Sequence, residues 1–167
     1  MADAPMSSCL NNLFEDVYSS PLGPIKLQSN ATHLLSVKFS DELITSKTNA
    51  LLQRCIKQFD EYFTGKRQSF DLPLAPPGTS FQQSVWRHLI QIDYGDTRSY
   101  SDIAAALGCE GAARAIGSAN RANPIAIIIP CHRIIGRNGS LTGYAGGIER
   151  KRALLALENL YFNSSQR

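Results

Sequence analysis

The chain has 167 residues, 43% of them hydrophobic and 19% charged, a composition that supports a buried core and excludes a disordered protein. Its longest aliphatic run, "IAIII", is too short to cross a membrane and no secretory leader is evident, so we expect an intracellular, cytoplasmic protein. The net charge of +3 is uneven, because residues 81–167 carry ten Lys or Arg against six Asp or Glu, and Lys151 is their only lysine. Guanidinium groups suit bidentate contact with phosphates, although ordinary surface charge is an equal alternative.

The cysteines and histidines show no metal-binding or disulfide pattern. They are widely separated, and no CxxC pair occurs. The residues concerned are Cys9, Cys55, Cys109, Cys131, His33, His88 and His132. We therefore predict no catalytic metal.

Residues 1–72 are predicted to form a small α/β domain. The segments "LFEDVYS", "PIKLQS" and "HLLSVKFS" alternate and are separated by turn residues, which predicts a three-stranded antiparallel sheet. A helical stripe follows and ends at a glycine; it consists of Leu52, Cys55, Ile56, Phe59 and Phe63, with Gly65 as the stop. Cys55 is then a core thiol, and residues 73–79 are a proline-rich linker.

Residues 80–160 are predicted to form a mostly helical second domain, which makes the chain an α+β protein. A capping box of Ser80 and Gln83 begins the first helix, whose apolar stripe includes Phe81 and places Trp86 in the core. Residues 161–167 are expected to be a frayed tail.

The stretch "SYSDIAAALGCEGAARAIGSANRANP" predicts a helix-turn-helix. Ser99 and Asp102 provide an N-cap, Gly108 ends the first helix, and the second helix runs over about 112–121. Its inward stripe consists of Ala112, Ala115, Ile116, Ala119 and Ala122, and its outward face of Arg114, Gly117, Ser118 and Arg121. The small outward residues allow close approach to a nucleic-acid backbone; the alternative is a tightly packed helix pair with two solvated arginines.

The stretch "AIIIPCHRIIG" places a thiol beside an imidazole where an expected buried strand ends. On the C-terminal helix, Glu158 shares the face of Leu154, so its carboxylate should need a buried partner. His132 is the obvious candidate, which gives a nucleophile, base and orienting acid in Cys131, His132 and Glu158. Such a polarised histidine is expected to lower the pKa of the thiol, acting through a water molecule. A core cysteine with a Glu–Arg pair elsewhere is the alternative.

A glycine-rich loop, "GSLTGYAGG", follows the thiol and carries one aromatic residue, Tyr144. Such a loop can close over a flat ligand, although glycine-rich loops are common.

Together these stretches resemble the O6-alkylguanine-DNA alkyltransferases, in their compact bacterial type. The resemblance is dense over residues 80–158, through "FQQSVWRHLIQIDYGDTRSY", "NPIAIIIPCHRIIG" and "GSLTGYAGGIERKRALLALE", and looser at "SPLGPIKL". It implies a DNA repair protein that extrudes O6-alkylguanine, with O4-alkylthymine as a second candidate substrate, and moves the alkyl group irreversibly to Cys131 in one turnover.

The resemblance also implies roles for individual residues. Arg114 would fill the gap left by the base, and Tyr100 would push on the phosphate and donate a proton. Glu158 would polarise His132, and Asn123 would hold the turn before the active site. The catalytic set is Cys131, His132, Glu158, Tyr100 and Asn123; the substrate set is Ile134, Tyr144, Ala145 and Gly146, with the Cys131 carbonyl; the DNA-binding set is Arg114, Tyr100, Ser101, Ser118 and Arg121.

Other implications concern cofactors and partners. The reaction needs no cofactor, and the partner is double-stranded DNA bound by a monomer, with cooperative binding left open. Ala145 stands where some members carry serine, and Asn30 stands where mammalian members have a zinc-binding cysteine, so no zinc is expected. If the source is bacterial the protein should lie with the nucleoid, and if eukaryotic in the nucleus.

Two other functions fit parts of the sequence. A binding-only damage sensor or helix-turn-helix regulator would never use the thiol, and a cysteine hydrolase would turn over repeatedly.

Overall fold

A computed structural model describes residues 12–166, so the expectation for Cys9 lies outside the described residues. The chain divides into two compact units, one ending at Pro76 and the other beginning at Pro77. Each unit is described by itself.

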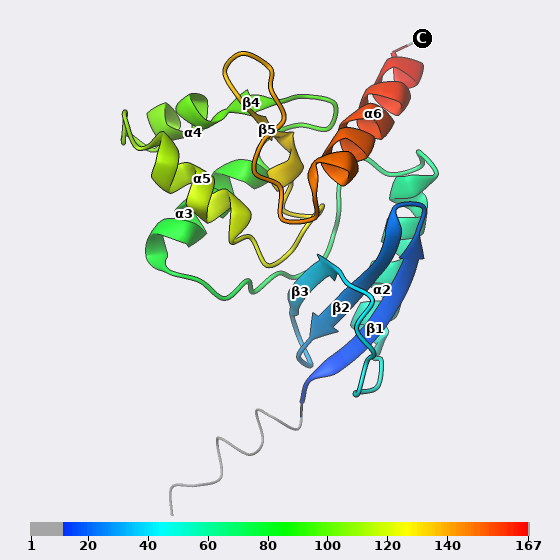
Figure 1. Ribbon diagram of the computed structural model, residues 1–167. Coiled ribbons are helices and arrows are strands. Elements are labelled where there is room, and N and C mark those ends of the chain that lie inside the picture. The colour runs from blue at the N-terminus through cyan, green and yellow to red at the C-terminus, as the bar shows by residue number, and fades with distance from the viewer. Residues whose placement is uncertain (1–11, 167) are drawn as a thin grey trace, which may run out of the picture. The chain divides into compact units, whose positions relative to one another are not determined.

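The first unit is a meander of three antiparallel strands with one helix, as predicted (Figure 1). Its elements are β1 (Phe14–Ser20), β2 (Gly23–Ser29), β3 (Leu34–Phe39) and α2 (Ala50–Phe63). Helix α2 packs on β1 and β2, and Cys55 is fully buried in its apolar stripe, where burial raises the thiol pKa to about 12. The first residues of the expected linker are not free, because Leu34 exchanges backbone hydrogen bonds with Pro73 and Ala75.

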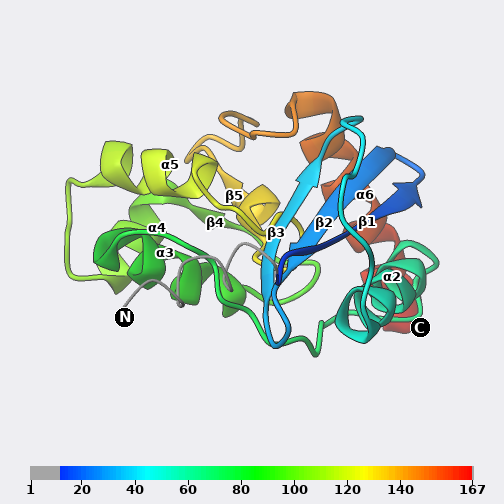
Figure 2. The ribbon, with the colours of Figure 1, turned by 90° about the horizontal axis from the view of Figure 1, so that it is seen from below.

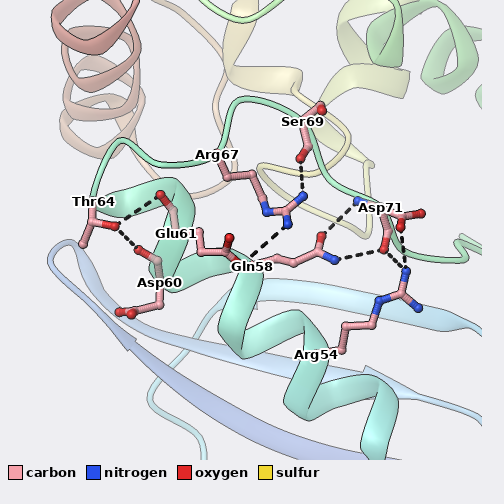
Figure 3. A network of polar contacts seen from close by, with 8 residues as sticks. All are labelled: Arg54, Gln58, Asp60, Glu61, Thr64, Arg67, Ser69 and Asp71. Atoms are coloured by element: carbon pink, nitrogen blue, oxygen red, sulfur yellow. Dashed lines mark hydrogen bonds and ion pairs between the residues drawn. The ribbon is translucent and has the colours of Figure 1, made fainter.

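Polar side chains of α2 fasten the segment that follows it (Figure 3). Gln58 both donates to the carbonyl of Asp71, at 3.0 Å, and accepts from its N–H, at 2.9 Å. Arg54 forms an ion pair with the Asp71 carboxylate at 3.1 Å. These contacts stabilise the fold of this unit and leave no reactive group beside them.

The second unit contains the helices and two short strands. Its elements are α3 (Ser80–Ile90), β4 (Arg98–Ser99), α4 (Tyr100–Ala106), α5 (Ala113–Arg121), the 3-10 helix η1 (Cys131–Arg133), β5 (Ile134–Ile135) and α6 (Ile148–Ser165). Helices α3, α4 and α5 pack together, and η1 contacts α3 and α6 (Figure 2). Strands β4 and β5 pair in parallel, with Arg98 opposite Ile134.

Helix α3 begins one residue earlier than predicted. Thr79 is its N-cap, and Gln82 completes the capping box. Phe81, in the first turn, is 38% exposed rather than part of the buried stripe, whereas Trp86 is buried as expected. The Trp86 indole N–H donates to the Ala119 carbonyl of α5 at 2.9 Å, which joins the two helices.

The expected tail is wrong for residues 161–165, because α6 continues to Ser165. The reason is a tertiary contact: the ring of Phe162 lies so close to Gly95 that a Cβ there would come within 2.7 Å of it. Gly95 therefore provides the room in which the last turns of α6 pack.

Candidate active site and nucleic-acid interface

The helix-turn-helix is formed by α4 and α5. Ser99 and Asp102 make the predicted capping box, and Gly108 lies in the left-handed region at φ +71°, where glycine ends a helix without strain. The inward face of α5 differs from the prediction, because Ala115 and Ala122 are exposed and Asn120 is buried.

The outward face of α5 borders an open pocket of about 480 Å³. The lining comes from α4, α5 and the glycine-rich loop, and consists of Tyr100, Ala113, Arg114, Gly117, Ser118, Arg121, Thr142 and Gly143. Both arginines are exposed. Of the DNA-binding residues predicted, Ser101 is exposed but does not line this pocket. The pocket is thus lined by two guanidinium groups and by Gly117, where the absence of a side chain would let a ligand come close to the backbone of α5.

The segment before the thiol is not the expected strand. Ile127 has φ +71°, a conformation that β-branched residues rarely adopt, and tight backbone hydrogen bonds wind residues 125–131 into successive turns. Asn123 stabilises this path, since its amide donates to the Ile129 carbonyl at 2.8 Å and its oxygen accepts from the Ile125 N–H at 3.0 Å. These turns lead directly into η1, of which Cys131 is the first residue.

Cys131 is 4% exposed, and burial raises the pKa of its thiol to about 11. This is opposite to the expected direction, because desolvation disfavours the thiolate more than the neighbours favour it. The opposing contributions come from the Asn123 side chain, the charge of Lys151 and the backbone N–H groups of Cys131 and His132. The resting thiol is thus protonated, with groups around it that favour a thiolate.

The buried carboxylate of Glu158 contacts His132, as the helical spacing suggested. His132 Nε2 lies 2.6 Å from Glu158 Oε1, and both side chains are buried. Burial lowers the pKa of His132 against the influence of Glu158, so the imidazole is neutral. Because Nε2 donates to the carboxylate, Nδ1 is left as the basic nitrogen, and it has no hydrogen-bond partner among the described residues.

Arg133 shares the same carboxylate, which the sequence analysis did not foresee. Its Nε and one terminal nitrogen each donate to Glu158 at 2.9 Å, and the other donates to the Ile92 carbonyl at 2.6 Å. Burial raises the pKa of Glu158, but the contacts with His132 and Arg133 outweigh it and bring the pKa to about 2. The two alternatives weighed for this carboxylate, a histidine or an arginine partner, are therefore both present.

Lys151 is a second residue that the sequence analysis missed. It is fully buried on α6, and its ammonium group donates to the Thr142 carbonyl at 2.8 Å. Its spacing from Leu154 and Glu158 is i, i+3 and i+7, which was a readable signal for a shared face. The Tyr100 hydroxyl donates to the same Thr142 carbonyl, at 3.0 Å, so one carbonyl joins the helix-turn-helix to the surroundings of the thiol.

The glycine-rich loop brings an aromatic ring into the site. Tyr144 is 8% exposed, its hydroxyl has no hydrogen-bond partner among the described residues, and burial raises its pKa. Ala145 is exposed and Gly146 half-buried, so their backbone is within reach of a ligand, while Ile134 is buried beside η1. The loop thus places the Tyr144 ring close enough to Cys131 for the charge of the thiolate to act on its hydroxyl.

The described residues contain neither a candidate metal cluster nor a candidate membrane span. Across residues 12–166, no three His, Cys, Asp or Glu side chains gather closely enough to hold a metal ion. No helix within the same range has the length and apolar character needed to cross a membrane.

Fold and site together define a helix-turn-helix protein with a buried cysteine next to a His–Glu–Arg cluster. Two family models match the chain: the DNA binding domain of 6-O-methylguanine DNA methyltransferase over residues 80–160, and its ribonuclease-like domain over residues 13–76. The chain belongs to the 6-O-methylguanine DNA methyltransferase family.

Individual relatives agree with this assignment. Methylated-DNA–protein-cysteine methyltransferase of Methanosarcina barkeri is 46% identical over 156 residues, which cover 87% of this chain and 97% of that protein. The enzyme of the same name from Mycobacterium tuberculosis is 48% identical, covering 83% and 88%. The structure of Mycobacterium tuberculosis OGT in complex with DNA has a TM-score of 0.83 and 44% identity, covering 89% of this chain and 94% of that one.

Proposed function

We propose that this protein repairs DNA by transferring the alkyl group of O6-alkylguanine to Cys131, once and irreversibly. The observation that carries the proposal is the placement of a buried thiol beside the His132–Glu158 pair, in a unit whose helix-turn-helix exposes Arg114 and Arg121 on its second helix. The names of its relatives support the same chemistry. We further propose O4-alkylthymine as a secondary substrate, and action as a monomer in the compartment that holds the DNA.

The thiol is too buried to meet a base that remains stacked in a duplex, so the reaction requires an extruded nucleotide. Extrusion costs a few kcal/mol, which a damaged base lowers. Arg114 is exposed on the outward face of α5 and would enter the space that the base leaves. Tyr100, at the start of α4, would press on the adjacent phosphate.

In the proposed reaction the thiol proton moves to His132 Nδ1, through a bridging water, and Glu158 stabilises the imidazolium that results. The sulfur attacks the alkyl carbon, an S–C bond forms, and the C–O bond to guanine breaks. The Tyr100 hydroxyl supplies a proton to the departing guanine. Tyr144, the Ala145 amide and the Ile134 carbonyl would hold the base.

The product thioether has no good leaving group, so nothing returns the thiol. This property separates the proposal from a cysteine hydrolase, whose acyl-enzyme is released by water. It also separates it from a binding-only sensor, in which the thiol stays unmodified.

The first experiment is mass spectrometry of the protein mixed with a duplex that carries one O6-methylguanine. We expect one added methyl group, on the peptide that contains Cys131, and no more than one per molecule. Cys131→Ser should bind the duplex and acquire no methyl group. A methyl group on the serine variant, or repeated turnover by the wild type, would contradict the mechanism; retention of the duplex with no added mass would indicate a sensor.

The role of Arg114 has its own test. Arg114→Ala should slow repair of a duplex far more than reaction with free O6-benzylguanine, because only the duplex requires extrusion. Arg152→Ala is the matched control, since it removes an exposed arginine from α6. Equal losses on both substrates would refute the insertion of Arg114.

A further inference from the structure

Asn120 is a buried amide on α5, the second or recognition helix of the helix-turn-helix, at a position that the sequence pattern assigned to neither face. Its side chain is 1% exposed, and Nδ2 donates to the backbone carbonyl of Cys131 at 3.2 Å. The two residues lie eleven positions apart, in α5 and η1. The nucleophile is thus tied directly to the helix that carries Arg114.

The orientation of this amide follows from the contact itself. If its oxygen faced the Cys131 carbonyl, two acceptors would lie within hydrogen-bond distance of one another, which is repulsive. With Nδ2 as the donor, Oδ1 has no hydrogen-bond partner among the described residues. Burying an amide that is only half satisfied costs free energy, whereas an apolar side chain of the same size would fill the space at no such cost. Core packing alone therefore does not account for asparagine here.

The carbonyl of Cys131 is held from two sides. It accepts the N–H of Ile134, which closes the 3-10 turn, and the amide of Asn120. Two such bonds fix the plane of the peptide group that follows the nucleophile, and with it the direction in which the side chain leaves the backbone.

Helix α5 is also held in place next to Asn120 by a hydrogen bond from α3. The carbonyl of the preceding residue, Ala119, accepts the indole N–H of Trp86 at 2.9 Å in a buried contact. Two consecutive residues of α5 thus bind two different elements, α3 and η1. Because α5 is fixed against α3, the hydrogen bond from Asn120 also fixes the position of the Cys131 carbonyl.

We infer that Asn120 is a positioning residue, which aligns the Cys131 sulfur for in-line attack by holding the carbonyl of the nucleophile against the recognition helix. The inference rests on the proposed function. Displacing a reacting group by a fraction of an ångström slows a reaction in which the substrate is bound in one orientation, and has much less effect on a small reagent that is not bound in the site. Asn120 contacts the backbone rather than the sulfur, so its loss should alter alignment and not the reactivity of the thiol itself.

The test compares Asn120→Leu, which keeps the size and removes the hydrogen bond, with Ile116→Leu on the same buried face. We expect Asn120→Leu to reduce the first-order transfer rate at saturating duplex roughly tenfold, the effect of one lost hydrogen bond. The rate with free O6-benzylguanine should fall equally, because the same attack geometry is needed. DNA affinity and the rate of alkylation by iodoacetamide should stay within about twofold of the wild type, as should all four readouts of Ile116→Leu.

An unchanged transfer rate would overturn the inference, and so would a parallel loss of iodoacetamide reactivity, which would indicate general disturbance of the site. If Asn120→Leu fails to fold, Asn120→Ser replaces it, because the serine hydroxyl can bond within the helix and does not reach Cys131. A wild type that takes no methyl group from a duplex carrying O6-methylguanine would refute the proposed function, and not the positioning role alone.

Discussion

Glu158→Gln tests the buried ion cluster most directly. The carboxylate is 1% exposed and accepts from His132 at 2.6 Å and from two nitrogens of Arg133 at 2.9 Å. Glutamine keeps the shape of the side chain and removes its charge, which leaves the Arg133 guanidinium buried without this counter-ion. Breaking a buried ion pair by removing one partner costs about 3–5 kcal/mol. We therefore expect the free energy of unfolding in urea to fall by about that amount.

Glu149→Gln, on the exposed face of the same helix, is the control for this substitution. Glu149 pairs with Arg152 on the exposed side of the same helix, where an ion pair contributes little. Glu149→Gln should leave the urea midpoint unchanged within error. If Glu158→Gln loses no more stability than Glu149→Gln, the assignment of a structural charge to Glu158 is refuted.

The same substitution should slow transfer in the molecules that remain folded. A glutamine amide can donate to His132 Nε2, and the imidazole proton then lies on Nδ1, which removes the basic nitrogen proposed to accept the thiol proton. Loss of a general base costs about 10²–10⁴ in rate. A single-turnover assay below the unfolding transition measures this; a rate within threefold of the wild type would contradict the proton path.

Two further predictions concern pH and the glycine-rich loop. The folded pKa values of Glu158, about 2, and of His132 both lie below their unfolded values, so the unfolded chain binds more protons and stability should decrease as the pH falls from about 6.5 toward 2. Urea midpoints at several pH values check this, and a flat profile would contradict it. Gly143→Ala places a Cβ 3.3 Å from the Tyr100 hydroxyl at φ +66°, so it should cost about 1–2 kcal/mol and also slow transfer. Gly139→Ala has similar strain at φ +84° with open space around it, so it should lose stability without slowing transfer; equal transfer rates for the two would refute the role of the Tyr100 contact.

The elements that the sequence predicted correctly are those with a strong local signal. The antiparallel meander follows from alternation, α2 from its apolar stripe, and the start of α4 from the Ser99–Asp102 capping box. The contact of Glu158 with His132 was predictable because helical spacing placed a carboxylate beside Leu154 on a buried face. In each case the pattern that made the prediction possible lies within a single strand, helix or capping box, even where the contact itself, as between Glu158 and His132, joins distant residues.

The errors fall where distant contacts override local preference. A run of β-branched residues at 125–129 predicts a strand, but Asn123 and the left-handed Ile127 wind it into turns. The frayed tail was inferred from composition, whereas the packing of Phe162 against Gly95 holds the last turns of α6. Neither feature could be recognised from the sequence pattern of residues 125–129 or 161–165 alone.

Buried polar residues were the hardest to foresee, since sequence patterns assign charged and amide side chains to the surface. Arg133, Lys151 and Asn120 are all buried, and each donates a hydrogen bond to a group in another segment: the Glu158 carboxylate, the Thr142 carbonyl and the Cys131 carbonyl. A buried polar group is stable only where its partner is already in place. These three buried hydrogen bonds connect the segments around the thiol, and none of them can be recognised from a local sequence pattern.

The burial of Cys131 and the single use that we propose are consistent with one another. A hydrolase must admit water to release its product, whereas a thiol that is 4% exposed, with a pKa raised by burial, is shielded from bulk water in the resting state. Such a site is suited to a ligand that carries its own reactive carbon into contact with the sulfur. Because the thioether ends the reaction, protection of the unused thiol matters more than access for release, and the buried cluster around Glu158 provides that protection together with the base.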